Sequence, residues 1–150
     1  MMALLECAGE QFTSAVVRFD DSFPSRESAT SSIYVRILVD ELGVELVALV
    51  DTGAPYCIIP TEIADELALD RTAGQPIRLS TRVGRLDGVL QRIKLTLLAD
   101  EGEAITVDAT VFVPDQWDHV SFLGYAGFLE RLNFGVRPST NEFFFGPAYD

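Results

Sequence analysis

The sequence has few basic side chains: 11 Lys and Arg stand against 23 Asp and Glu in 150 residues, giving a formal net charge of −12. A surface with this charge repels the phosphate backbone, so we expect no nucleic-acid partner. Long apolar runs are also missing. The run Leu46–Val50 is far shorter than the ~20 residues of a membrane-spanning helix, so we do not expect this chain to be an integral membrane protein.

Cysteine and histidine are equally scarce. Cys7 and Cys57 do not make a disulfide framework, and neither a CxxC motif nor a His cluster accompanies them. His119 is the only histidine, and the sequence near it contains no residue that looks like an activated nucleophile. The apolar residues at the N-terminus are not preceded by Lys or Arg, whereas those of a signal peptide would be. We therefore expect reduced thiols, a cytoplasmic location, no metal and no other cofactor.

What the sequence does contain is mostly alternation of apolar and polar residues, the period-two pattern of β-strands. The alternating segments are 33–39, 77–80, 93–97 and 105–113. Leu46–Val50 is apolar throughout, which is typical of a strand buried on both faces. Two stretches have helical spacing instead, namely 61–69, with Thr61 in the N-cap position, and 125–132. The pattern predicts a mostly β protein with two short helices.

A polar loop at 20–32 separates the short apolar segment Ala15–Phe19 from the rest of the chain. We therefore divide the chain into an N-terminal segment, 1–32, and one domain, 33–150. Within this domain, an apolar strand, a glycine-containing turn and a helix occur at 46–69 and again, in shorter form, at 120–132. This order indicates an internal duplication, although the two copies share little identity.

Asp51 directly follows the apolar run that ends at Val50, and Gly53 lies two residues further on. A carboxylate at the edge of a core is costly unless it is hydrogen-bonded. The missing side chain of Gly53 lets another backbone or a ligand come close. From spacing alone two interpretations stay open: an Asx-type turn in which Asp51 caps its own loop, or a carboxylate placed there for function.

Further motifs occur in a fixed order along the chain. Asp51-Thr52-Gly53-Ala54 ends the apolar run, Ile58-Ile59 leads to the first predicted helix, and Phe122-Leu123-Gly124 repeats the first motif in outline before the second predicted helix. With these motifs the sequence resembles the retropepsin-like (retroviral-type) aspartic proteases, particularly their bacterial single-domain relatives, over about residues 33–146. The resemblance implies an all-β acid-protease fold: a closed β-barrel with two short helices, pairing as a two-fold dimer.

The resemblance also implies that Asp51 is the catalytic residue of an aspartic endopeptidase. Hydrolysis without a metal or a covalent intermediate needs one group to deprotonate water and another to protonate or polarise the carbonyl. Two close carboxylates that share a proton can do both, and aspartic proteases are the standard example of this pairing. Because the chain has one such motif, Asp51 would have to meet Asp51 of a second subunit. We therefore expect a homodimer that acts on a polypeptide substrate.

Other roles follow from the same resemblance. Thr52 would hydrogen-bond across the two-fold axis, Gly53 would let the two loops approach, and Ala54 would line the pocket. The segment 81–91 would form a β-hairpin flap over the substrate, and its central residues are Gly84, Arg85, Leu86, Asp87 and Gly88. An ordinary hairpin is the alternative for this segment.

The two ends of the predicted fold carry apolar segments, Ala15–Phe19 and Glu142–Gly146. In a lone domain of this kind they would be exposed edges, so we expect them to pair in a dimer. Tyr125 and Ala126 stand where many relatives carry Arg and then Asp or Asn, so a polar contact common in those relatives is absent. The alternative function is a catalytically inactive peptide-binding or interaction module of the same fold.

Overall fold

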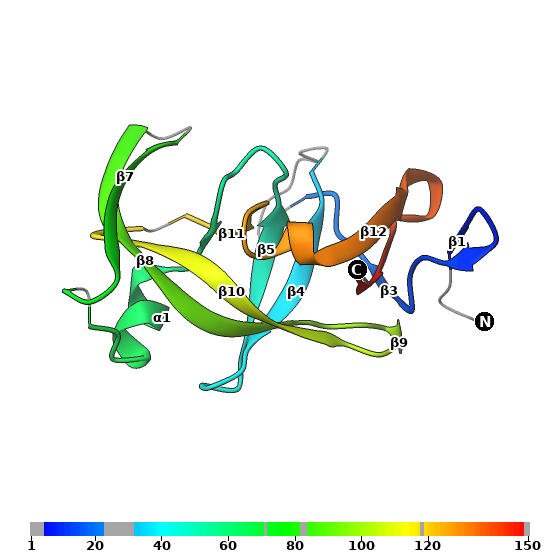
Figure 1. The fold of residues 1–150 in the computed structure, drawn as a ribbon, viewed down its shortest axis with the longest axis horizontal. Helices are drawn as coiled ribbons and strands as arrows, with labels where there is room; N and C mark the ends of the chain where they lie inside the picture. The colour runs from blue at the N-terminus through cyan, green and yellow to red at the C-terminus, as the bar shows by residue number, and fades with distance from the viewer. Residues whose placement is uncertain (1–4, 23–31, 71, 82–83, 118, 149–150) are drawn as a thin grey trace.

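The computed structural model describes residues 5–22, 32–70, 72–81, 84–117 and 119–148. Residues 23–31 of the predicted 20–32 loop, and the flap residues Arg82 and Val83, lie outside this described part. The described chain is mostly β, as the alternating pattern predicts (Figure 1).

The larger sheet has seven strands in the order β10-β6-β11-β5-β4-β8-β7. Its strands are β4 (Tyr34–Val39), β5 (Val44–Val50), β6 (Cys57–Ile58), β7 (Gln75–Thr81), β8 (Gly84–Leu97), β10 (Ile105–Pro114) and β11 (Ser121–Leu123). Strand β10 also pairs antiparallel with β8, so the pairings from β10 round to β8 form a closed ring. The four segments predicted as strands from their alternation all lie in this sheet.

The main core is built by the inward residues of these strands. Val35, Ile37 and Val39 are buried, whereas Arg36 between them is exposed, so the alternation predicted for this segment is confirmed. The prediction that Leu46–Val50 is buried on both faces is wrong. Only Ala48 of this run is buried, because one face of β5 packs on the core while the other remains half-buried.

A second sheet has four strands in the order β12-β13-β3-β9. Its strands are β3 (Ala15–Arg18), β9 (Glu101–Gly102), β12 (Leu132–Arg137) and β13 (Glu142–Pro147), with the short helix η2 (Pro138–Thr140) between the last two. A separate two-stranded hairpin is formed by β1 (Glu6–Cys7) and β2 (Glu10–Gln11).

Strands β3 and β13 pair antiparallel within one chain, with Val17 opposite Phe143 and Ala15 opposite Phe145. We expected these two segments to be exposed edges that pair in a dimer. This expectation is wrong, because the two strands already pair with each other within one chain. The side chains of Phe143 and Phe145 enter the main core. Phe144 points to the opposite face of the sheet, where it packs with Val16 and Leu5.

The first predicted helix is present but shorter than 61–69: α1 spans Thr61–Glu66. Thr61 does not act as its N-cap, since Pro60 occupies that position. The Thr61 hydroxyl instead accepts a hydrogen bond from the Trp117 amide at 2.6 Å. A left-handed backbone at Ala68, with φ +53°, keeps the chain from continuing as a helix to Leu69.

The second predicted helix, 125–132, does not form. A turn occupies 125–128, the 3-10 helix η1 spans Leu129–Arg131, and β12 begins at Leu132. The amides of Tyr125 and Ala126 donate to the carbonyls of Ala54 and Pro55, at 2.8 and 2.9 Å, instead of entering helical geometry. In the described part of the chain, no helix has the length and apolar character of a membrane span.

Candidate active site

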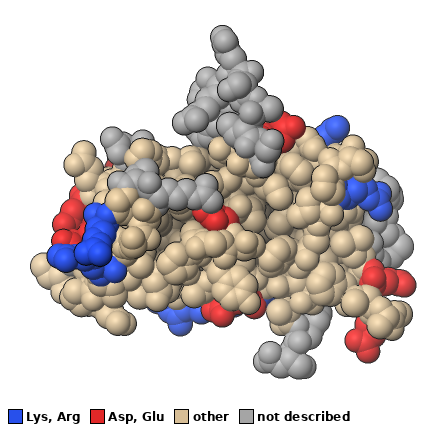
Figure 2. All heavy atoms as spheres, turned by 90° about the horizontal axis from the view of Figure 1, so that it is seen from above, with Lys and Arg blue, Asp and Glu red and all other residues tan. Residues whose placement is uncertain are grey.

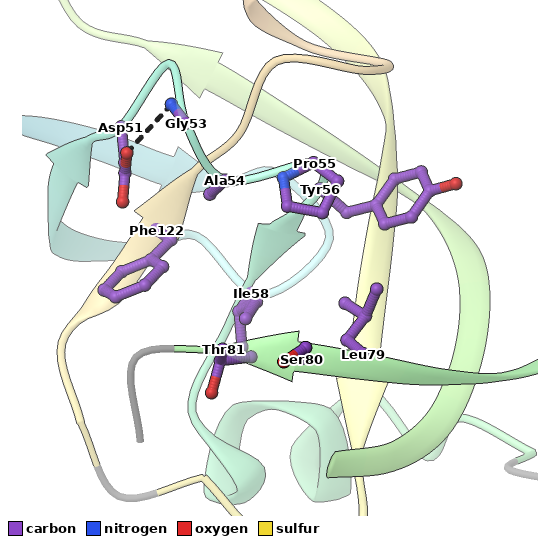
Figure 3. A pocket seen from close by; sticks show the side chains of 10 residues that line it. All are labelled: Asp51, Gly53, Ala54, Pro55, Tyr56, Ile58, Leu79, Ser80, Thr81 and Phe122. Carbon is purple, nitrogen blue, oxygen red and sulfur yellow. Dashed lines mark hydrogen bonds between the residues drawn. The ribbon is translucent and has the colours of Figure 1, made fainter. Parts of the chain in front are cut away.

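Asp51 lies in a loop directly after β5, as predicted. Its amide donates to the carbonyl of Leu123 at 3.0 Å, and its carbonyl accepts from the amide of Ala54 at 3.1 Å. Its side-chain Oδ1 accepts a hydrogen bond from the Gly53 amide at 3.0 Å (Figure 3). This last contact is the hydrogen bond expected if Asp51 caps its own loop in an Asx-type turn, the first of the two interpretations left open by the sequence. It also fixes the direction of the carboxylate, so it is compatible with a functional role.

The second motif lies directly beside the first. Strand β11 pairs parallel with β5, placing Leu123 opposite Val50, and it also pairs with β6, placing Phe122 opposite Ile58. A side chain at Gly124 would put its Cβ 2.3 Å from the carbonyl carbon and oxygen of Tyr56. Only glycine permits this crossing without a shift of the backbone. The second motif therefore supports the loop that carries Asp51.

A pocket of about 150 Å³ opens beside the Asp51 carboxylate. Its lining residues are Asp51, Gly53, Ala54, Pro55, Tyr56, Ile58, Leu79, Ser80, Thr81 and Phe122. Figure 3 shows Asp51 and Phe122 on one side of this space and the end of β7 across from them. Apolar groups make up most of the wall, and Asp51 is the one carboxylate among the described residues that line it. This combination suits an extended polypeptide with apolar side chains next to a reacting group.

The predicted flap is a hairpin of β7 and β8. The register pairs Leu79 with Leu86 and Ile77 with Gly88, which places Gly84, Arg85, Leu86, Asp87 and Gly88 on its second strand. None of these five residues lines the pocket described above. Leu79, Ser80 and Thr81 from the first strand do so, and the sequence analysis missed them. Alternation in 77–80 predicted a strand there, but nothing in it showed that this strand faces Asp51.

The hairpin is fixed at its base and along its exposed side. A Cβ at Gly88 would lie 2.3 Å from the carbonyl oxygen of Val113 and 2.8 Å from the ring of Phe112, so this glycine lets β8 lie close against β10. On the exposed side, Arg78 Nε lies 2.7 Å from Asp87 Oδ1. The hydrogen bond from Arg78 lowers the pKa of the Asp87 carboxyl, and the charge of Arg78 adds to this effect.

Thr52, Cys57 and His119 do not line the pocket. Thr52 is exposed at the tip of the Asp51 loop. Cys57 is buried, as predicted, and its burial raises the pKa of its thiol to about 12 although a hydrogen bond with Gly124 opposes this, so it is not a nucleophile. His119 is exposed and contacts the ring of Trp117 edge-on. In the described ranges, no group of three or more His, Cys, Asp or Glu side chains is arranged to hold a metal.

Comparisons with known proteins agree with this fold. Residues 38–131 match the family described as "gag-polyprotein putative aspartyl protease". A retropepsin-like aspartic protease from Rickettsia conorii has a similar structure, with a TM-score of 0.56 and 19% identity over 86% of this chain and 97% of that one. The retroviral protease-like domain of Ddi1 from Leishmania major gives a TM-score of 0.51 and 18% identity over 79% of this chain and 94% of that domain. No curated protein matches the sequence.

The strand order, the paired motifs and these structural matches define a retropepsin-like fold. The match over 38–131 covers more than half of the chain and includes both motifs. The chain belongs to this family of retropepsin-like aspartic proteases, as the sequence resemblance implies.

Proposed function

We propose that the protein is an aspartic endopeptidase, active as a homodimer, in which Asp51 of each subunit supplies one catalytic carboxylate. One observation carries the proposal: a carboxylate oriented by its own loop lies at an apolar pocket that a β-hairpin borders. Family membership supports the same conclusion. In this proposal the closed ring of strand pairings is the acid-protease barrel, and the free thiols Cys7 and Cys57 suit a reducing, cytoplasmic location.

The proposed reaction needs two carboxylates with one proton between them. The ionised carboxylate takes a proton from water, whose oxygen attacks the scissile carbonyl carbon, while the protonated carboxyl hydrogen-bonds and then protonates the carbonyl oxygen. Collapse of the tetrahedral intermediate breaks the C–N bond and transfers a proton to the leaving amine. Among the described residues that line the pocket Asp51 is the only carboxylate, so in this proposal the second carboxylate comes from another copy of the chain.

Neighbouring residues would complete the site. Thr52, exposed at the tip of the loop, would hydrogen-bond across the two-fold axis. Gly53 would keep the Asp51 carboxylate oriented and let the two loops approach, while Ala54 forms part of the wall. The hairpin of β7 and β8 would cover a bound polypeptide and exclude water during the reaction.

The proposal is tested by Asp51→Asn, with Asp108→Asn as a matched control. Asp108 lies on β10 and is exposed, so its replacement removes the same charge away from the pocket. We expect Asp51→Asn to lower kcat for cleavage of an unfolded polypeptide by at least about 10²-fold, since acid–base groups contribute roughly 10²–10⁴-fold. The control should keep the wild-type rate. Equal cleavage by wild type and Asp51→Asn would refute the mechanism.

Sedimentation of the wild type tests the requirement for two subunits. A monomer that binds extended peptides without cleaving them would be the inactive module instead, because a monomer cannot supply the second carboxylate.

A dyad that works only when singly protonated should give a bell-shaped dependence of rate on pH, with limits that belong to the pair. Measuring kcat/KM from about pH 3 to 8 at two ionic strengths checks this expectation, because the net charge of −12 per chain makes the profile depend on salt. Substrate binding and dimer mass are followed in parallel. A rate that rises steadily to high pH would point to a different catalyst.

A further inference from the structure

We propose that Trp117 is a positioning residue: it fixes the wall of the Asp51 pocket and thereby decides which substrate side chains fit beside the catalytic carboxylate. This inference rests on the proposed function, because it names a residue that would set the specificity of that reaction. Trp117 does not line the pocket itself. It acts through Phe122, which does.

Three large apolar side chains form a row on the outer face of the seven-stranded sheet. Phe112 of β10 lies opposite Ile58 of β6, and Ile58 lies opposite Phe122 of β11. Their neighbours along the strands point to the other face, because successive side chains of a strand alternate. These neighbours all belong to the main core: Cys57, Ile59, Val111, Val113 and Leu123. The row therefore lies outside that core, and Ile58 and Phe122 form part of the pocket wall (Figure 3).

Trp117 covers this row from the loop between β10 and β11. Only 2% of its surface is exposed, although loop residues usually lie at the surface. Trp117, Ile58 and Phe112 are the buried members of one apolar cluster, the Trp117 cluster, which is separate from the main core. The ring of Trp117 meets the ring of Phe122 edge-on, with 5.3 Å between their centroids. Trp117 therefore supports Phe122.

Hydrogen bonds hold Trp117 from two directions. Its amide donates to Thr61 Oγ1 at 2.6 Å, and its carbonyl accepts from the Thr61 amide at 3.2 Å, so its loop is tied to the first residue of α1. Its indole Nε1 donates to the carbonyl of Val120 at 3.1 Å. Because Val120 comes two residues before Phe122, this bond also fixes the backbone that brings Phe122 into the pocket wall.

The hairpin of β7 and β8 packs against the same cluster. Four partly buried side chains of the hairpin make this contact: Ile77, Leu79, Leu86 and Leu90. The register places Leu79 of β7 opposite Leu86 of β8, so both strands turn apolar side chains to the cluster. Leu79 also lines the pocket, as Phe122 does. The Trp117 cluster therefore supports the pocket wall on the hairpin side as well as on the β11 side, and it fixes their spacing.

The pocket between these walls is small and mostly apolar. Figure 2 views the face toward which the hairpin rises in Figure 1, and uncharged residues occupy most of the middle of that face. A charged side chain that enters an apolar wall loses hydration at a cost in free energy. We therefore expect the pocket, with its volume of about 150 Å³, to select among uncharged side chains by size. Such selection depends on how firmly Phe122 is held.

The test compares Trp117→Leu and Trp117→Phe with Phe143→Leu as the matched control. Phe143 is fully buried in the main core, so its replacement also removes a buried aromatic ring, but away from the Trp117 cluster. Each protein is assayed on two uncharged peptides that differ only in the side chain before the scissile bond, which is either valine or phenylalanine. The measured quantity is the ratio of kcat/KM for the two peptides.

We expect Trp117→Leu to change this ratio at least about tenfold, since differences of fit in an apolar pocket discriminate by about 10–200-fold. Trp117→Phe keeps a ring against Phe122 and should change the ratio less. Phe143→Leu should change it less than about twofold, because distant sites act independently. Circular dichroism and sedimentation verify that each variant is folded and has the wild-type mass under the assay conditions.

Thr61→Val provides a second variant that leaves Trp117 in place. It removes the hydroxyl that accepts from the Trp117 amide, and it should shift the ratio in the same direction as Trp117→Leu, whereas Thr61→Ser keeps the hydroxyl and should retain the wild-type ratio. An unchanged ratio in the Trp117 and Thr61 variants would overturn the inference and leave the proposed function intact. If the wild type binds both peptides without cleaving them, the proposed function fails, and the ratio of the two dissociation constants then tests the inference in the same variants.

Discussion

Gly124→Ala tests whether the second motif supports the catalytic loop as described. The new Cβ would lie 2.3 Å from the carbonyl carbon and oxygen of Tyr56 and 2.7 Å from its Cα, all main-chain atoms that no rotamer change can move away. Such overpacking costs about 1–3 kcal/mol. The shift needed to relieve it also weakens the bonds from Tyr125 and Ala126 to the loop, each worth about 1 kcal/mol. We expect the free energy of unfolding to fall by about 2–5 kcal/mol.

Gly43→Ala is the matched control, because Gly43 has φ +65° and a Cβ there meets no atom within 4 Å. Backbone strain alone should cost about 1–2 kcal/mol. Urea unfolding at one fixed protein concentration, followed by the fluorescence of Trp117, the only tryptophan and a buried one, measures both variants. Gly124→Ala should also lose peptidase activity under conditions where it remains folded, whereas Gly43→Ala should retain it. Equal stability and activity of the two variants would refute the described crossing.

Three further outcomes are expected. A thiol reagent at pH 8 should modify the exposed Cys7 in the native protein and reach Cys57 only after unfolding; rapid labelling of both native thiols, counted by mass spectrometry, would contradict the burial of Cys57. The hydrogen bond and the charge of Arg78 lower the pKa of Asp87 in the folded state. The stabilisation of the hairpin by this ion pair is therefore present above the ordinary carboxyl pKa and is lost as the pH falls through the lowered pKa. Hydrogen exchange of β7 and β8, corrected for the intrinsic effect of pH, should therefore quicken in acid, and Asp87→Asn should remove this pH dependence; a variant with unchanged dependence would exclude the ion pair as its cause. Thr52→Ala should raise the dimer dissociation constant and leave the subunit fold unchanged, which sedimentation and circular dichroism would show, and equal constants for variant and wild type would count against a contact across the axis.

The alternation of apolar and polar residues was sufficient to predict which residues are buried in the strands whose burial alternates. Val35, Ile37 and Val39 lie in the core, whereas Arg36 is exposed and Leu38 half-buried between them, because a β-strand turns successive side chains to opposite faces. The position of Asp51 in a loop was equally accessible from the sequence, since a charged residue followed by Thr and Gly cannot continue a buried strand without cost.

Long-range contacts decided the features that the sequence did not reveal. The segment 125–132 has helical spacing, yet the carbonyls of Ala54 and Pro55 hold its first amides, and Gly127 takes a left-handed φ of +82°. Spacing carries no information on those partners. The same limit explains why Leu79 was missed as a pocket residue, because the register of the hairpin and its position over the sheet decide which strand faces Asp51.

The pairing of β3 with β13 has a consequence for how the domain folds during synthesis. Ala15 and Val17 are made early, but the strand that covers them contains Phe143 and Phe145, which are made more than a hundred residues later. Contacts of such long sequence separation slow folding, because the chain loses much of its entropy before they form. A nascent chain without β13 lacks part of its apolar core and exposes the edge of β3, a state prone to misassociation. The domain can therefore reach its native state only after β13 has been synthesised.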